Sequence, residues 1–185
     1  MEVLPRPPTL YILCGLPFSG KSSLGEAIAA HTGSVVVSFD ALYDAHGEEL
    51  GRRLDTLAVW RAIRELAGER IGALLGRGVS VVYDNTNFRV AHREAIRAVA
   101  EGVGARAVLI HVDTPLEVIA ARRAANARTR ERGDISDAAL AYVRGVWQRP
   151  GESEGALVYR PEMELAGWLG RLVGDTRDES PGLIA

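Results

Sequence analysis

The chain has 185 residues, enough for one domain with a sizeable core, and its 47% hydrophobic and 25% charged residues are typical of a globular protein. Its formal net charge of −2 provides no basic excess that would require nucleic-acid binding, and no apolar run approaches the roughly 18 residues of a membrane-spanning helix. The single cysteine, Cys14, excludes an internal disulfide, so we expect a protein of the reducing cytoplasm.

Short apolar runs and helical repeats alternate along the chain. After a loose proline-rich arm, the first half predicts a strand over Thr9–Cys14, a helix over Ser22–His31, a strand over Val35–Phe39, a helix over Arg53–Leu75 and a strand over Val79–Tyr83. The second half predicts a helix over Arg89–Glu101, a strand over Ala107–Val112, a helix capped by Thr114, a helix capped by Ser136 and ending near Trp147, a strand over Ala156–Tyr159 and a helix over Pro161–Val173. This alternation predicts an α/β fold, in which a parallel five-stranded sheet carries helices on both faces. We expect residues 1–175 to form this single domain and residues 176–185 to form a flexible tail.

A glycine-rich loop follows the first predicted strand. The sequence Gly15-Leu-Pro-Phe-Ser-Gly-Lys-Ser22 fits the P-loop pattern, and it lies between a strand and a helix, which is the context that the motif requires. Glycines let successive amides point at phosphate oxygens, and the positive end of the helix adds to the attraction. We expect the loop to bind ATP through Gly15, Ser19, Gly20, Lys21, Ser22 and Ser23. Lys21 would reach the β- and γ-phosphates, and the Ser22 hydroxyl would bind Mg²⁺.

Three predicted strands end in an aspartate, at Asp40, Asp84 and Asp113. The carboxyl ends of strands line the ligand crevice of an open α/β sheet, so each carboxylate is a candidate for Mg²⁺ or for an acceptor hydroxyl. Each aspartate could equally serve a turn or a helix cap, and for Asp113, beside the Thr114 cap, we favour that interpretation. We favour catalysis for Asp40 and a substrate wall for Asp84-Asn-Thr-Asn87. None of these strands ends in Asp-Glu and no Asn-Lys-x-Asp motif occurs, which favours transfer to an acceptor over a motor or a switch.

The stretch from residue 122 to residue 132 contains five arginines: Arg122, Arg123, Arg128, Arg130 and Arg132. A basic stretch of this kind usually forms a solvated helix face. Here it follows the fourth predicted strand, so we favour an arginine-rich helical lid over about residues 114–150. Guanidinium groups of a lid can clamp a migrating phosphoryl group and screen its charge.

Together these features resemble the polynucleotide-kinase-like branch of P-loop phosphotransferases over Leu10–Glu154. The resemblance implies a P-loop NTPase fold with Asp40 as the general base and with Asp84 and Asn87 near the acceptor. It also implies that the lid acts through an arginine, which we assign to Arg123, Arg128 and Arg130 as a group. The chain departs from the family pattern at Phe18, where glycine is frequent, at Tyr43, where polynucleotide kinases often place an arginine, and at Trp147-Gln-Arg-Pro150, where Phe-Glu-Pro-Pro is frequent.

The expected function is ATP-dependent transfer of the γ-phosphate to a hydroxyl group. As acceptor we favour a polynucleotide 5′-hydroxyl, with Phe88 and Tyr43 stacking a base, although packing is the commoner role of such aromatics. The main alternative is a small-molecule kinase for a sugar, a nucleoside or an antibiotic, which the slight net acidity and Tyr43 favour. A third alternative is a regulator that binds ATP without catalysis.

Overall fold

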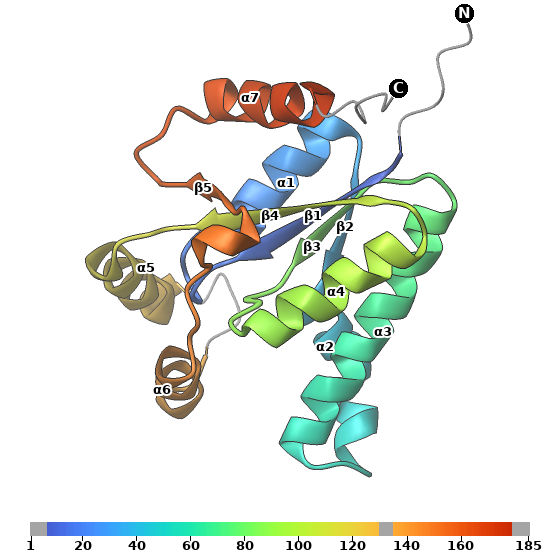
Figure 1. The fold of residues 1–185 in the computed structure, drawn as a ribbon. Helices are drawn as coiled ribbons and strands as arrows, with labels where there is room; N and C mark the ends of the chain where they lie inside the picture. The colour runs from blue at the N-terminus through green and yellow to red at the C-terminus, as the bar shows by residue number, and fades with distance from the viewer. Residues whose placement is uncertain (1–6, 130–134, 179–185) are drawn as a thin grey trace, which may run out of the picture.

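The computed structural model describes residues 7–129 and 135–178, and its centre is a parallel β-sheet (Figure 1). The strands lie in the order β2-β3-β1-β4-β5, and every neighbouring pair is parallel. Their bounds are β1 Thr9–Cys14, β2 Val35–Ser38, β3 Val81–Asp84, β4 Arg106–Val112 and β5 Leu157–Tyr159. The expected five-stranded parallel sheet is therefore confirmed.

Helices cover both faces of this sheet, as its continuous apolar strands require. Their bounds are α1 Lys21–Thr32, α2 Phe39–Gly51, α3 Thr56–Gly76, α4 Val90–Gly102, α5 Leu116–Thr129, α6 Asp137–Gly145 and α7 Leu165–Asp178, with a short 3₁₀ turn, η1, over Glu152–Glu154. On one face the core joins strand residues such as Ile12 to Ile63 and Ile71 of α3. On the other face Leu13 meets Ile28 of α1 and Leu172 of α7. Figure 1 shows α5 and α6 at one end of the molecule, outside both layers.

One helix, α2, was not expected from the sequence. Phe39 does not extend the strand but begins α2, so Asp40 lies in the first turn of a helix instead of at the end of a strand. The Ser38 side chain accepts a hydrogen bond from the backbone amide of Ala41 at 3.3 Å and caps the helix. A serine followed by an acidic first turn is a helix-start signal, which the apolar Phe39 obscured.

Of the two caps predicted for the later helices, one is confirmed and one is not. Ser136 caps α6 as predicted, through a bond from the Ala139 amide. Thr114 does not cap α5, because its hydroxyl donates to the Ser19 carbonyl, 95 residues away in sequence. The last helix begins at Leu165 and not at Pro161 as predicted. At its start the Glu164 carboxylate accepts hydrogen bonds from the backbone amides of Ala166 and Gly167. The helix continues to Asp178, and residues 179–185 of the predicted tail lie outside the described part. No described helix combines the length and the apolar character needed to cross a membrane.

Candidate functional site

The loop between β1 and α1 curls as the P-loop pattern predicts. Gly20 has φ of 101°, and a Cβ atom on Gly15 would lie 2.9 Å from the carbonyl oxygen of Val112, so both glycines are needed where they stand. Phe18 also has a positive φ, of 63°, which costs a non-glycine residue about 1–2 kcal/mol. The sequence therefore accepts backbone strain to keep a bulky side chain in this loop.

Side chains from outside the loop hold its carbonyl groups. Arg122 donates from Nη1 to the carbonyl of Ser19 at 2.7 Å and to that of Phe18 at 3.3 Å. The Thr114 hydroxyl donates to the same Ser19 carbonyl at 2.8 Å. The first amides of α1, which begins at Lys21, lack intrahelical acceptors and carry the positive end of the helix. The loop therefore has its carbonyls fixed from one side while amides remain for an anion.

Lys21 is the only lysine of the chain, and it is buried in this loop with 8% of its surface exposed. Its Nζ donates to the carbonyl of Leu16 at 2.9 Å. Burial lowers the pKa of its ammonium group, and the carboxylates of Asp84 and Asp40 oppose that shift. The structure therefore places one cation in the field of two carboxylates, Asp84 at the end of β3 and Asp40 in the first turn of α2.

Asp40 and Asp84 are neighbours because β2 and β3 are paired in parallel, with Ser38 opposite Asp84. The Asp40 side chain reaches solvent, yet partial burial of its carboxyl group raises its pKa. The Asp84 carboxylate raises that pKa further, and Lys21 opposes the shift. A carboxylate with a raised pKa can accept a proton more readily than a free aspartate.

The same edge of the sheet offers hard oxygen donors. The Ser22 hydroxyl is exposed in the first turn of α1, and Asp84 supplies a carboxylate; such donors fit Mg²⁺. Within residues 7–129 and 135–178, no three His, Cys, Asp or Glu side chains gather as a metal cluster. A divalent ion here would therefore take most of its ligands from phosphate and water. Asp113 lies apart from this group and forms ion pairs with Arg149 at 2.9 Å and Arg160 at 3.2 Å.

The residues predicted to contact an acceptor have different environments. The Asn87 side chain is buried and donates to the carbonyl of Leu13 at 2.7 Å, while its Oδ1 has no protein partner. Phe88 is also buried and packs edge-on against His92, so its ring is engaged in packing. Tyr43 is 39% exposed and stacks on Phe39 in α2.

The predicted arginine group is divided by the structure. Arg123 donates to the carbonyl of Ile135 and to the Asp137 carboxylate at 2.6 Å, and so joins α5 to α6. Arg128 is exposed near the end of α5, and Arg130 lies outside the described residues. The arginine that reaches the P-loop is Arg122, which the sequence analysis did not select. The sequence could not distinguish Arg122 from its neighbour Arg123. The rotation of α5 about its axis decides which of the two side chains faces the loop.

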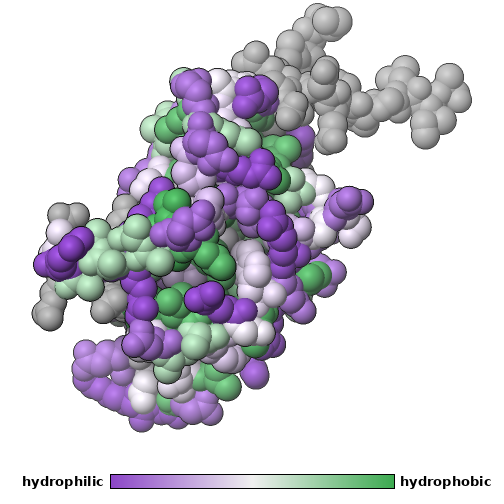
Figure 2. All heavy atoms as spheres, turned by 90° about the vertical axis from the view of Figure 1, so that its left-hand side faces the viewer, coloured by the Kyte–Doolittle hydropathy of each residue, from purple (hydrophilic) through white to green (hydrophobic). Residues whose placement is uncertain are grey.

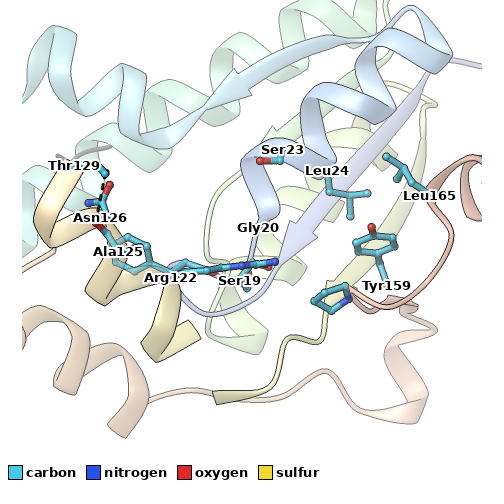
Figure 3. A pocket seen from close by; sticks show the side chains of 12 residues that line it. Ser19, Gly20, Ser23, Leu24, Arg122, Ala125, Asn126, Thr129, Tyr159 and Leu165 are labelled. Carbon is cyan, nitrogen blue, oxygen red and sulfur yellow. Dashed lines mark hydrogen bonds between the residues drawn. The ribbon is translucent and has the colours of Figure 1, made fainter. Parts of the chain in front are cut away.

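A pocket of about 480 Å³ opens beside the P-loop (Figure 3). Its lining comes from the start of α1, from α5 and from the segment between β5 and α7, and it comprises Phe18, Ser19, Gly20, Ser23, Leu24, Arg122, Ala125, Asn126, Thr129, Tyr159, Pro161 and Leu165. In Figure 3, Arg122 reaches from α5 toward Ser19 and Gly20, and Tyr159 and Leu165 lie on the other side. The planar side chains of Arg122 and Tyr159 lie in a pocket that is continuous with a phosphate-binding loop. Such a pocket suits the base of a nucleotide.

Cys14, directly before the loop, is fully buried, and burial raises the pKa of its thiol to about 12. The thiolate is the reactive form, so we expect native Cys14 to react with a disulfide reagent such as DTNB at least about a hundredfold more slowly than the unfolded chain at pH 8. Because the chain has one cysteine, the released chromophore reports this site alone. Equal rates with and without guanidinium would contradict the packing described.

Comparisons with known proteins agree with this geometry. The family model AAA_33, described as an AAA domain, matches residues 10–150. No curated protein matches the sequence. Among solved structures, a gluconokinase from Sinorhizobium meliloti is 23% identical with a TM-score of 0.65, and the match covers 95% of this chain and 99% of that chain.

Two further structures are similar and were solved with ligands. APS kinase CysC from Mycobacterium tuberculosis, in complex with AMPPNP and APS, is 22% identical with a TM-score of 0.66, over 94% of this chain and 98% of that chain. Kti12 from Chaetomium thermophilum, in complex with ADP-AlF3, is 16% identical with a TM-score of 0.70, over 89% of this chain and 97% of that chain. At these identities the likeness concerns the fold, which is a P-loop kinase-like fold.

Proposed function

Because the chain belongs to the AAA_33 family of AAA domains, we propose that it is a kinase that transfers the γ-phosphate of ATP to the hydroxyl group of an acceptor. One observation carries this proposal: Lys21 of the P-loop lies in the joint field of Asp40 and Asp84. A phosphate-binding cation is thereby combined with a carboxylate that can take a proton, which are the two parts that phosphoryl transfer needs.

The nucleotide would lie with its triphosphate in the loop from Gly15 to Ser23 and its base in the pocket beside Arg122 and Tyr159. The pocket adjoins Gly20 and Ser23 at the start of α1, so a single extended ligand can occupy both. AMPPNP in the similar APS kinase and ADP-AlF3 in the similar Kti12 support a nucleotide as the ligand. Ser22 and Asp84 would hold Mg²⁺, whose charge would offset that of the phosphates.

In the transfer step the acceptor oxygen forms a bond to the γ-phosphorus, and the bond from that phosphorus to the bridging oxygen breaks, releasing ADP. Asp40 orients the acceptor hydroxyl and takes its proton. Lys21 and the loop amides hold the phosphates in line, so that catalysis rests mainly on positioning and electrostatics. The segment from residue 114 to residue 150 would act as the lid, with Arg122 now added to Arg123, Arg128 and Arg130 as its candidate arginines.

The acceptor separates the two kinase alternatives. Similarity to a gluconokinase and to an APS kinase over nearly the whole chain favours a small molecule, whereas the resemblance to polynucleotide kinases stays a prediction. The test offers γ-labelled ATP together with 5′-hydroxyl DNA, 5′-hydroxyl RNA and a panel of small alcohols and sugar acids. Label transferred to any acceptor supports the proposal. ATP binding without transfer to any of them favours the regulator and contradicts it.

The pocket beside the P-loop, proposed to hold the base of the nucleotide, gives a separate prediction. Truncating Arg122 to alanine should raise the Kd for ATP about tenfold, since it removes the flat wall of the pocket, and should change the Kd for inorganic tripolyphosphate less. Arg77→Ala is the control, because Arg77 is exposed at the end of α3 and does not line the pocket, and it should change neither Kd more than about twofold. Calorimetric titration measures both constants. Equal effects of the two substitutions on ATP affinity would contradict the assignment of the pocket.

A further inference from the structure

A cluster of aromatic and arginine side chains joins α3, the start of α4 and α6 near Tyr83, at the end of β3. Tyr142 of α6 packs against Trp60 of α3 and against Phe88, with a centroid distance of 6.3 Å in each case. Its hydroxyl accepts a hydrogen bond from Arg89, which precedes α4, at 3.0 Å. Arg64 lies one turn after Trp60 on the same face of α3 and interacts electrostatically with Arg89 and Tyr142.

The charge of this cluster, formed by Trp60, Arg64, Arg89 and Tyr142, is positive and uncompensated. Within the described part of the chain, no carboxylate forms an ion pair with Arg64 or Arg89, although both side chains are half-buried. Arg61 adds a third guanidinium group to the field at Arg64. His92 adds no charge at neutral pH, because burial, together with Arg64, Arg89 and Arg93, lowers its pKa to about 4.

The cluster borders the acceptor side of the cleft. Arg89 follows the loop Asp84–Asn87 after one intervening residue, and Arg64 interacts with the Tyr83 hydroxyl, which accepts a bond from Asn85 within the same loop. The nucleotide pocket, in contrast, is lined by α5 and by the segment after β5. Seen from the side of α5 and α6, hydrophobic residues form separate patches among hydrophilic ones (Figure 2), so this face offers no continuous apolar surface.

We propose that the acceptor carries an anionic group, a phosphate or a carboxylate, which Arg64 and Arg89 bind while its hydroxyl lies at Asp40. This inference rests on the proposed kinase function and names the chemical class of its acceptor. The planar guanidinium group matches the geometry of both anions, and charge-assisted hydrogen bonds make its binding to either of them strong. Trp60 and Tyr142 would give the remainder of the acceptor aromatic rings to pack against. A neutral acceptor would leave both half-buried guanidinium groups without a carboxylate or phosphate as counter-ion among the described residues.

The site is tested by measuring the binding of small anions under conditions in which no phosphate is transferred. The protein is saturated with AMPPNP and Mg²⁺ so that the P-loop is occupied, and its melting temperature is measured with matched pairs of probes. Gluconate is compared with glucose for a carboxylate, and adenosine 3′-monophosphate with adenosine for a phosphate. We expect at least one anionic probe to bind about tenfold more tightly than its neutral counterpart. The pair that shows the preference identifies which anion the site takes.

Substitutions locate the effect. Arg64→Gln and Arg89→Gln should each remove most of the preference for the anion and leave AMPPNP binding unchanged. Arg70→Gln, which changes an exposed arginine of the same helix α3, is the matched control and should keep the preference. No preference in either pair, or a preference that survives in both variants, would overturn the inference. Because no phosphate is transferred in this experiment, its failure leaves the proposed kinase function standing, and failure of the transfer assay leaves a measured anion site standing.

Discussion

Replacing Asp40 with asparagine is expected to lower kcat for phosphoryl transfer about 10²–10⁴-fold, the usual contribution of a positioned general base. The Kd for ATP should stay within about twofold, because the phosphates are held by Lys21 and the loop and not by Asp40. Single-turnover measurement with γ-labelled ATP and the accepted substrate gives the rate, and titration gives the Kd. Asparagine keeps the size and a polar oxygen of the side chain, so the comparison isolates proton acceptance.

The dependence of kcat on pH gives a second test of Asp40 as the general base. Asp40 must be ionised to accept a proton, and its pKa is raised by partial burial and by Asp84. Activity should therefore fall on acidification at a higher pH than an ordinary aspartate would give, and it should be fully present above the raised pKa. The Asp40→Asn variant should lack this acid limb.

Asp44→Asn is the matched control, since Asp44 is an exposed carboxylate one turn further along α2 and interacts only weakly with Asp40. It should change kcat no more than about threefold, as expected of an exposed charge. Full activity in Asp40→Asn, or an equal loss in both variants, would show that Asp40 is not the base.

The second large effect is expected on stability, at Arg93. This side chain is 1% exposed and forms a double hydrogen bond with the Glu154 carboxylate, at 2.6 and 2.8 Å. Three further acceptors surround its guanidinium: the carbonyl of Asn87, the carbonyl of Gln148 and the sulfur of Cys14. Arg93 thus joins β1, the loop after β3 and the segment that returns from α6.

Arg93→Met should lower the free energy of unfolding by about 3–5 kcal/mol, because it leaves a partly buried carboxylate and two carbonyls without their donor. Urea unfolding measures the change. Arg52→Met removes an ion pair of similar length, 2.8 Å, that lies exposed between neighbouring turns, and should cost at most about 0.5 kcal/mol.

Glu154→Gln provides a milder variant that is expected to fold. It should cost about 1–2 kcal/mol, since the amide oxygen can still accept one bond. Arg93 holds the pKa of Glu154 below its usual value, so the stability from this pair is present above the ordinary pKa of glutamate and is lost as the pH falls through the lowered one. A cost below about 1 kcal/mol for Arg93→Met would show that the network does not hold these segments together.

Local sequence patterns predicted the parallel sheet and the phosphate-binding loop. The strand over Thr9–Cys14 was predicted to the residue, and the glycine spacing from Gly15 to Ser22 identified the loop, because both depend on local features: a run of apolar residues and a backbone that only glycine allows. The neighbourhood of Asp40 and Asp84 followed from a general property of parallel sheets, in which the carboxyl ends of strands meet at one edge.

The side chains that complete the site come from distant parts of the chain, and no local pattern predicted them. Arg122 and not Arg123 faces the loop, and it bonds to Ser19 across 103 residues of chain. No sequence pattern predicted the nucleotide pocket beside Tyr159 or the hydrogen bonds of Arg93 to four different residues. The residues that form each of them come from separate elements. Such contacts depend on the rotation and placement of whole helices, which the packing of the entire core fixes and which no short stretch of sequence specifies.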